Sequence, residues 1–227
     1  MERKNMGLKD FVDQPDKIMT FSNIMLQVIF RYKKHIIGVI CAVIAAASLW
    51  AANSYFSSKA EARALAAMYE VFSRYQVLSR EEGPPAAYQA VKKDFERVLD
   101  QYSDRETSRI SRMIYADICY DSGQFDQALK LYQSALNDFG QEPYKSMILS
   151  GLAYSFEAKK DYKNAAAHFE RIVSEGGALM KSEALFGLGR LYELAGDMEK
   201  SRSAYQQLVS DDPDSIYFEA AREKISG

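Results

Sequence analysis

Residues that interrupt helices or carry reactive side chains are scarce in this sequence. Its 227 residues include five prolines, twelve glycines, two cysteines and two histidines. Because proline and glycine end helices and form most turns, their scarcity beside many helix-forming residues favours a mostly helical chain over one rich in strands. The two cysteines lie far apart, one of them inside an apolar run, so we expect no intramolecular disulfide.

Motifs of catalysis and cofactor binding are also missing. The sequence contains no phosphate-binding loop, dinucleotide fingerprint or nucleophile elbow. His35 and His168 have no cysteine or acid at a convincing metal-ligand spacing, which predicts no metal site. Acidic residues are so numerous that paired carboxylates arise by chance on charged helices, so none is assigned a catalytic role. We therefore expect a protein that is not an enzyme and that needs no cofactor or metal.

Charge is unevenly distributed along the chain. The net charge is −2, yet residues 1–35 carry seven Lys or Arg against four acids, whereas the residues after 56 carry 22 against 27. The larger part has no basic strip, so nucleic acid is not an expected partner.

A run of 21 residues without charge, IIGVICAVIAAASLWAANSYF, occupies positions 36–56. As a helix it would extend about 30 Å, enough to cross the hydrocarbon core of a bilayer. This run predicts a single transmembrane helix. A cleaved signal peptide is the alternative, but a polar leader of 35 residues is too long for an ordinary n-region, so we expect an uncleaved anchor.

The residues around this run predict its orientation. Arg31, Lys33 and Lys34 stand before it, and Trp50 lies near its C-terminal end, where an indole suits the membrane interface. The positive-inside rule then places the N-terminus in the cytoplasm. The remainder of the chain would lie across the inner membrane, in the periplasm of a Gram-negative bacterium.

A second apolar segment, IMTFSNIMLQVIF, precedes the anchor at 18–30. It is too short to span a bilayer and contains several polar residues. Its helical periodicity predicts an amphipathic helix that lies along the inner membrane surface or against a partner helix. Packing beside the anchor is an equal alternative.

The stretch ALFGLGRLYELAGDMEKSRSAYQQLVSDDP, residues 184–213, alternates bulky apolar side chains with small ones at helical spacing. With Gly196 as position 15, positions 4, 7, 11 and 24 are large and positions 8 and 20 are small: Leu185, Leu188, Tyr192, Tyr205, Gly189 and Ser201. This is the tetratricopeptide pattern, in which small residues let two antiparallel helices approach and large residues fill the space between them.

The same pattern fits two earlier stretches. Position 8 falls at Ala116, Ala153 and Gly189, so successive copies are offset by 37 and 36 residues. Residues 57–102 resemble a degenerate fourth hairpin, in which GPP at 83–85 ends the first helix. The anchor helix is expected to continue outward into this hairpin. After the repeats, Asp214 or Ser215 is expected to cap a last helix that covers the final apolar face.

The sequence thus predicts an all-α chain in which a single transmembrane helix precedes a tetratricopeptide-repeat α-solenoid with a C-terminal capping helix. The parts are a cytoplasmic leader with its amphipathic segment, the anchor, the degenerate hairpin, three repeats and the capping helix: 1–35 (with 18–30), 36–56, 57–102, 105–213 and 214–227.

The first helix of each repeat is expected to line a concave groove. Positions 2, 5, 9, 12 and 13 of the repeats supply aromatic and acidic side chains, which suit a peptide or helix with apolar anchors and basic flanks. The candidate peptide-binding residues are Met113, Asp117, Tyr120, Asp121, Ser150, Tyr154, Glu157, Phe186, Arg190 and Glu193. Taken singly, each ring is explained more simply by packing against a neighbouring repeat, and each acid by solubility.

Capture of an acidic C-terminal tail is disfavoured. Some tetratricopeptide domains bind the terminal carboxylate of a chaperone. These domains resemble one another in having Lys at position 5 and Asn at position 9 of the first repeat. Here these positions hold Met113 and Asp117. Arg190 is the only basic residue among the candidate groove residues, so the groove is poorly suited to an acidic tail.

The whole layout, a short leader, basic residues RYKKH before one anchor, a helical pair and then repeats, resembles the ancillary subunits of the bacterial Sec translocon. This resemblance implies a place beside the translocon with a membrane-anchored chaperone, assisting proteins that emerge into the periplasm. The partners would be translocon components, periplasmic chaperones or exported chains.

Two classes of function stay open. In the first, the repeats form a chaperone-like binding module that transiently holds exported chains or their chaperones. In the second, the protein is a permanent structural subunit of an envelope complex for secretion, division or outer-membrane assembly. The repeats also resemble those of the Tol-Pal coordinator and of the outer-membrane assembly lipoprotein. A homo-oligomer stays open in either class.

Overall fold

In the part of the chain that the computed structural model describes, all the regular secondary structure is helical. The described residues are 15–103, 105–139, 141, 143–175 and 180–226, with side chains described from residue 31 onward. Contacts divide the chain into two compact units, residues 1–59 and 60–227, and each is described by itself.

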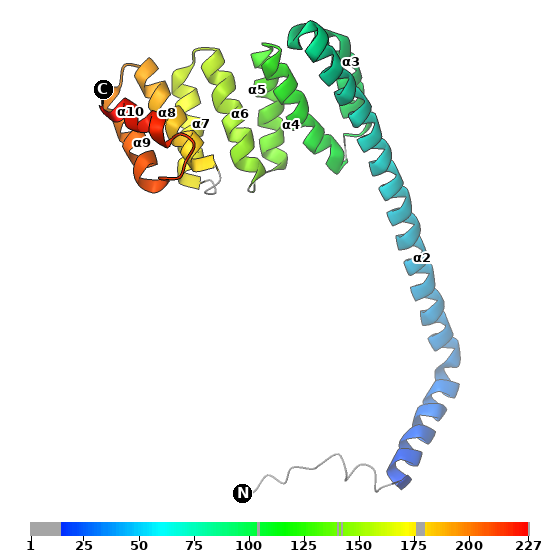
Figure 1. Ribbon diagram of the computed structural model, residues 1–227. Helices are drawn as coiled ribbons and strands as arrows, with labels where there is room; N and C mark the ends of the chain where they lie inside the picture. The colour runs from blue at the N-terminus through cyan, green and yellow to red at the C-terminus, as the bar shows by residue number, and fades with distance from the viewer. Residues whose placement is uncertain (1–14, 104, 140, 142, 176–179, 227) are drawn as a thin grey trace, which may run out of the picture. The chain divides into compact units, whose positions relative to one another are not determined.

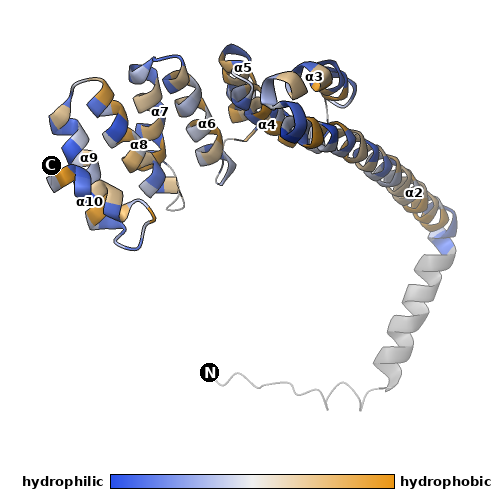
Figure 2. Ribbon diagram, turned by 45° about the horizontal axis from the view of Figure 1, so that its top comes forward, coloured by the Kyte–Doolittle hydropathy of each residue, from blue (hydrophilic) through white to orange (hydrophobic). Residues whose placement is uncertain are grey.

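The first helix, α2 (Pro15–Glu82), contains the apolar run 36–56. Within Arg31–Glu82 it is long and apolar enough to cross a membrane, with a mean hydropathy of 2.1 over its most apolar window and none of that window buried. Figure 2 shows the apolar character of this part of α2. A signal sequence passes the same test of length and composition, so membrane insertion itself stays a prediction. The amphipathic segment 18–30 falls within α2, but its side chains lie outside the described residues, as do residues 1–14.

The helix α2 ends where the sequence predicts an interruption. Gly83 adopts a left-handed φ of 86°, and α3 (Pro84–Gln101) then begins with proline, whose missing N–H costs nothing in a first turn. In the second unit, the last part of α2 packs against α3 through a cluster of buried side chains: Met68, Val71, Tyr75, Tyr88, Val91 and Phe95. The two helices thus form a pair ahead of the repeats.

Three helical hairpins follow α3. They are α4 (Glu106–Asp121) with α5 (Phe125–Asp138), α6 (Tyr144–Ala158) with α7 (Tyr162–Glu175), and α8 (Lys181–Leu194) with α9 (Met198–Asp211). From α3 to α10, each helix packs against the next along the chain, so the hairpins stack side by side (Figure 1). The predicted all-α tetratricopeptide-like solenoid is confirmed.

The turn inside each hairpin depends on one left-handed residue at the same repeat position. Gly123 and Gly196 have φ values of 75° and 80°, as glycine permits without steric cost. In the middle hairpin Lys160 occupies this position with φ 63°, which costs a side-chain-bearing residue about 1 kcal/mol. The turn geometry is therefore kept even where its preferred residue is absent.

The core repeats one close contact between an aromatic ring and a glycine. The buried rings of Tyr132, Phe169 and Tyr205 stand at position 24 of the three hairpins. A Cβ added at Gly187 would lie only 2.7 Å from Cε2 of Phe169, and Gly151 faces Tyr132 with similar closeness. Since real side chains do not approach so closely, each glycine lets its helix lie directly on the ring of the preceding hairpin.

The last helix, α10 (Phe218–Ser226), covers the end of the stack. Its Ala221 is buried in a cluster with Leu185, Tyr205 and Leu208. The helix begins at Phe218, later than the predicted start at 214. The hydroxyl of Ser215 accepts a hydrogen bond from the backbone N–H of Tyr217 at 3.2 Å, in a turn that precedes the helix.

We predict that Gly187→Ala destabilises the protein. In an unobstructed helix this change adds about 0.5–1 kcal/mol of stability, but here the methyl group overlaps the Phe169 ring, and overpacking of this kind costs about 1–3 kcal/mol. Thermal unfolding followed by circular dichroism measures the change. In a Phe169→Leu background, the alanine should cost much less, and a stabilising effect in the wild-type background would contradict this account.

Candidate functional site

The ten predicted groove residues lie on the first helices of the three hairpins. Four belong to α4, three to α6 and three to α8: Met113, Asp117, Tyr120 and Asp121; Ser150, Tyr154 and Glu157; Phe186, Arg190 and Glu193. They therefore share one face of the repeat stack, where their contacts form three groups. The first two groups overlap at Ser150 and Tyr154, and Asp121 lies beside the first.

The first group surrounds a cavity between α4 and α6. This cavity, called below the α4/α6 groove, has a volume of about 250 Å³ and is partly open to solvent. It includes five of the ten predicted residues. Its lining consists of Met113, Asp117, Tyr120, Tyr132, Met147, Ser150, Gly151, Tyr154 and Met180. Apolar sulfur-containing side chains, aromatic rings and one carboxylate thus converge on one hollow.

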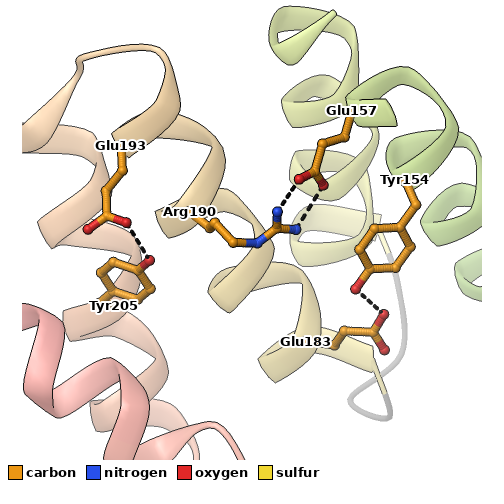
Figure 3. Close-up of polar contacts among 6 residues, drawn as sticks. All are labelled: Tyr154, Glu157, Glu183, Arg190, Glu193 and Tyr205. Atoms are coloured by element: carbon orange, nitrogen blue, oxygen red, sulfur yellow. Dashed lines mark hydrogen bonds and ion pairs between the residues drawn. The ribbon is translucent and has the colours of Figure 1, made fainter. Parts of the chain in front are cut away.

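The second group closes the corresponding junction between α6 and α8. Glu183 accepts hydrogen bonds from the hydroxyls of Ser150 at 3.0 Å and Tyr154 at 2.9 Å. Arg190 forms a two-pronged ion pair with Glu157, whose Nη2–Oε2 distance is 2.8 Å. Figure 3 shows the contacts of Tyr154 and Arg190 bridging the two helices. These polar bridges tie α6 to α8 across the face that the groove residues share.

The third group packs against α10 and the turn that precedes it. The ring of Phe186 stacks on Tyr217, with centroids 5.0 Å apart and planes at 21°. Glu193 accepts a hydrogen bond from Tyr205 at 3.4 Å (Figure 3) and pairs with Lys224 at 3.0 Å. Phe186 and Glu193 thus make contacts within the chain at the end of the stack. For Phe186 this agrees with the simpler expectation that each ring packs against a neighbouring element.

Asp117 in the α4/α6 groove and Asp121 beside it have no cationic partner among the described residues. Asp117 accepts a hydrogen bond from the Tyr132 hydroxyl, and Asp121 stands one helical turn further along α4. Among the described residues, no Lys, Arg or His side chain lies within ion-pair distance of either carboxylate. The charges of this pair are therefore left uncompensated within the described chain.

The surroundings of both carboxylates disfavour their ionised form. Asp117 is exposed to water, but crowded protein atoms reduce its hydration and raise its pKa. The hydrogen bond from Tyr132 opposes this shift, while the negative charge of Asp121 adds to it. Loss of hydration also raises the pKa of Asp121. Each carboxylate would gain from a cation placed beside it.

Sequence reasoning missed several residues of this face. Met147 lines the groove and Glu183 closes the next junction, and both occupy position 2 of their repeats, one of the positions expected to line the groove. Repeat numbering could therefore have found both. Tyr132 comes from a second helix and Met180 precedes α8, so the first-helix positions could not indicate them.

The predicted membrane-orienting residues are exposed on α2. Arg31, Lys33 and Lys34 lie on the helix before the apolar run, and Trp50 is 74% exposed within it. Residues at a membrane boundary are expected at such positions. The role of these four residues in orienting the helix stays a prediction.

The cysteine and histidine of the repeats serve packing. Cys119 is buried, and burial raises the pKa of its thiol to about 12. His168 stacks on Phe156 with centroids 5.4 Å apart, and burial lowers its pKa. In the described part of the chain, no three His, Cys, Asp or Glu side chains are grouped so that they could hold a metal ion.

Comparison with known families agrees with this architecture. A family model described as a tetratricopeptide repeat-like domain matches residues 30–222. The chain belongs to this family. Tetratricopeptide repeats generally form non-catalytic scaffolds for protein–protein interaction.

Solved structures share the fold at low sequence identity. A tetratricopeptide repeat protein from Parabacteroides merdae ATCC 43184 is 14% identical, with a TM-score of 0.55 over 70% of this chain and 59% of its own. The TPR-like repeats of a putative kinesin light chain from Podosopora anserina are 15% identical, with a TM-score of 0.53 over 70% of this chain and 84% of theirs. At these identities the likeness concerns the fold alone.

One curated relative matches over a shorter stretch. The general transcriptional corepressor trfA of Dictyostelium discoideum is 33% identical over 87 residues, which are 38% of this chain and 6% of that protein. The match thus spans a small fraction of trfA, and corepression is a property of that relative.

We predict that replacing both uncompensated carboxylates, by Asp117→Asn with Asp121→Asn, stabilises the protein at neutral pH. A carboxyl whose pKa is raised by folding favours the folded state at low pH, and that contribution is lost as the pH rises above the ordinary aspartate range. The double variant should therefore unfold about 2 °C higher than the wild type at pH 7.5, and the difference should shrink towards pH 4.

Thermal unfolding of the full chain in detergent at both pH values measures this effect. The matched control, Glu199→Gln with Asp214→Asn, removes two exposed acids that lie outside the groove. It should show no comparable gain. A wild type at least as stable as the double variant at pH 7.5 would contradict the assigned surroundings of the two carboxylates.

Proposed function

We propose that the protein is an interaction scaffold anchored in the inner membrane, whose repeats hold exported proteins or chaperones near the Sec translocon. The α4/α6 groove is the observation that carries this proposal. It is an apolar hollow on the face formed by the first helices of the repeats. It belongs to the unit 60–227, which does not include the apolar run 36–56.

The lining of the groove suits side chains of a protein partner. Three of its members, Met113, Met147 and Met180, are flexible and polarizable, so they can adapt to apolar anchors of different shape. Met147 is 49% exposed, which leaves apolar surface available to a partner. At about 250 Å³ the cavity is smaller than typical small-molecule pockets of about 300–1,000 Å³ and matches one or two inserted side chains.

Membrane anchoring is supported by the surface of α2. Large apolar side chains within 36–56 are exposed, including Val39, Val43 and Trp50. An exposed apolar surface of this extent needs a bilayer or a partner protein to cover it. The family match begins at residue 30 and therefore includes this run. Basic residues before the run favour a cytoplasmic N-terminus and periplasmic repeats.

A permanent structural subunit of an envelope complex is the second candidate. The observation that favours it is an exposed apolar stripe on α2 beyond the predicted membrane run, where Leu65, Tyr69 and Val77 are all more than half exposed. A permanent partner could bind the protein through this stripe without contacting the α4/α6 groove. The sites of crosslinking distinguish the two candidates.

The proposed topology predicts the reactivity of introduced cysteines. Of the native pair, Cys41 lies in the apolar run and Cys119 is buried, so neither should react with a membrane-impermeant maleimide. Ser203→Cys, at an exposed position of α9, should be labelled in cells whose outer membrane is permeabilised. Lys9→Cys, in the leader, should be labelled only after lysis. Labelling of Lys9→Cys in intact cells would reverse the predicted orientation.

Photoreactive residues test the groove in living cells. Introduced at Tyr120 or Met147, they should capture several exported chains, chaperones or Sec components, because both positions line the groove. Lys163, exposed on α7 and outside this groove, provides the control position and should capture far less. Mass spectrometry of the adducts identifies the partners.

The pattern of capture decides between the candidates. Abundant capture of one envelope protein from Tyr69, with none from the groove positions, would establish the structural-subunit alternative instead. Polar substitutions at Ile24 and Val28 in the leader would then be expected to release the protein from its complex.

A further inference from the structure

The two junctions between successive repeats differ in how their equivalent positions are filled. At the α6/α8 junction, positions 5 and 9 of one repeat hold Ser150 and Tyr154, and both bond to Glu183 at position 2 of the next. At the α4/α6 junction, the equivalent positions 5 and 2 hold Met113 and Met147. Methionine cannot form these bonds, so this junction lacks the polar bridge.

The ion pairs differ in the same way. At the α6/α8 junction, Glu157 at position 12 is neutralised by Arg190 at position 9 of the next repeat. At the α4/α6 junction, these positions hold Tyr120 and Tyr154. The acids of this junction, Asp117 and Asp121, therefore receive no cation from the neighbouring repeat, and a cavity occupies the space between the helices.

We infer that the α4/α6 groove binds an apolar segment of a partner protein that carries a lysine or arginine beside its anchoring side chain. The apolar side chain occupies the hollow formed by Met113, Met147 and Met180, and the cation lies against the carboxylates of Asp117 and Asp121. The partner thereby supplies the charge that Arg190 supplies within the chain at the next junction. This inference rests on the proposed function of the groove face and names the chemistry that the groove selects.

Charge complementarity distinguishes this groove from a hollow elsewhere on the repeats. A cavity of about 450 Å³ beside α7 and α9 is lined by Tyr162, Glu170, Tyr192 and Lys200, among others. There the Tyr192 hydroxyl donates to Glu170, and Lys200 pairs with Asp197 while lying over the Tyr192 ring. The carboxylates that line this cavity, Glu170 and Asp197, thus already have partners within the chain, whereas Asp117 of the α4/α6 groove has no cation beside it among the described residues.

Three fluorescein-labelled decapeptides test this selectivity. They share a central Leu-Phe-Leu core and differ in four flanking residues, which are lysine, glutamine or glutamate. The full-length protein is held in phosphatidylcholine nanodiscs, and empty nanodiscs report binding to lipid. Fluorescence anisotropy at low salt should give a Kd for the lysine peptide at least about 10-fold below that of the glutamate peptide, and this preference should weaken as salt screens the charges.

Matched variants locate the selectivity. Asp117→Asn with Asp121→Asn should raise the Kd of the lysine peptide by about 10-fold and leave that of the glutamine peptide nearly unchanged. The control, Glu199→Gln with Asp214→Asn, changes the net charge equally at exposed sites that do not line the groove. It should leave both Kd values nearly unchanged. A loss that is equal in the two double variants would show attraction to net charge alone and overturn the inference.

Other outcomes separate this inference from the proposed function. If the glutamine peptide binds as tightly as the lysine peptide, the groove binds apolar segments without selecting charge, so the inference fails and the proposed function stands. If no peptide binds while photoreactive residues at Tyr120 or Met147 still capture proteins in cells, the inference fails again. Absence of both peptide binding and capture would overturn the inference and the proposed function together.

Discussion

The contact between an aromatic ring and a glycine backbone sets the distance at which successive hairpins pack. Phe169 lies on Gly187, and Tyr132 lies on Gly151, so each ring of a second helix supports the first helix of the next repeat. Because repeat proteins gain stability mainly from contacts between neighbours, this contact fixes the stack one junction at a time. With the backbones held at this distance, the other side chains of each junction can vary without loss of the fold.

Because these side chains can vary, the α4/α6 and α6/α8 junctions share a backbone arrangement but differ in chemistry. Between α6 and α8, hydrogen bonds to Glu183 and the pair of Arg190 with Glu157 fill the face. Between α4 and α6, methionine and tyrosine occupy the equivalent positions, and a cavity is left. Since a contact between a ring and a glycine maintains the spacing at both junctions, the open junction does not collapse. An opening of this kind is available to a partner without rearrangement of the repeats.

The repeat architecture could be predicted because its pattern is local. Small and large residues at fixed spacing identified the hairpins, and Gly83 with two prolines identified the end of α2. The site was only partly predictable, because repeat position shows which face a residue shares but not what covers it. Phe186 was expected in the groove, yet it stacks on Tyr217 because α10 folds back over the last repeat. Met180, outside the helical positions, joins the cavity only through the three-dimensional path of the chain.

The two uncompensated carboxylates support the proposal that the open junction binds a partner. A cavity lined only by apolar groups would lower stability through missing contacts alone. Here the chain also keeps Asp117 and Asp121 one turn apart, where loss of hydration raises the pKa of both carboxyls and the charge of Asp121 adds to the shift at Asp117. Groups that oppose stability in the free protein are characteristic of sites where a partner relieves the cost. Under the proposed function, a cation bound beside them would offset this cost by compensating both charges.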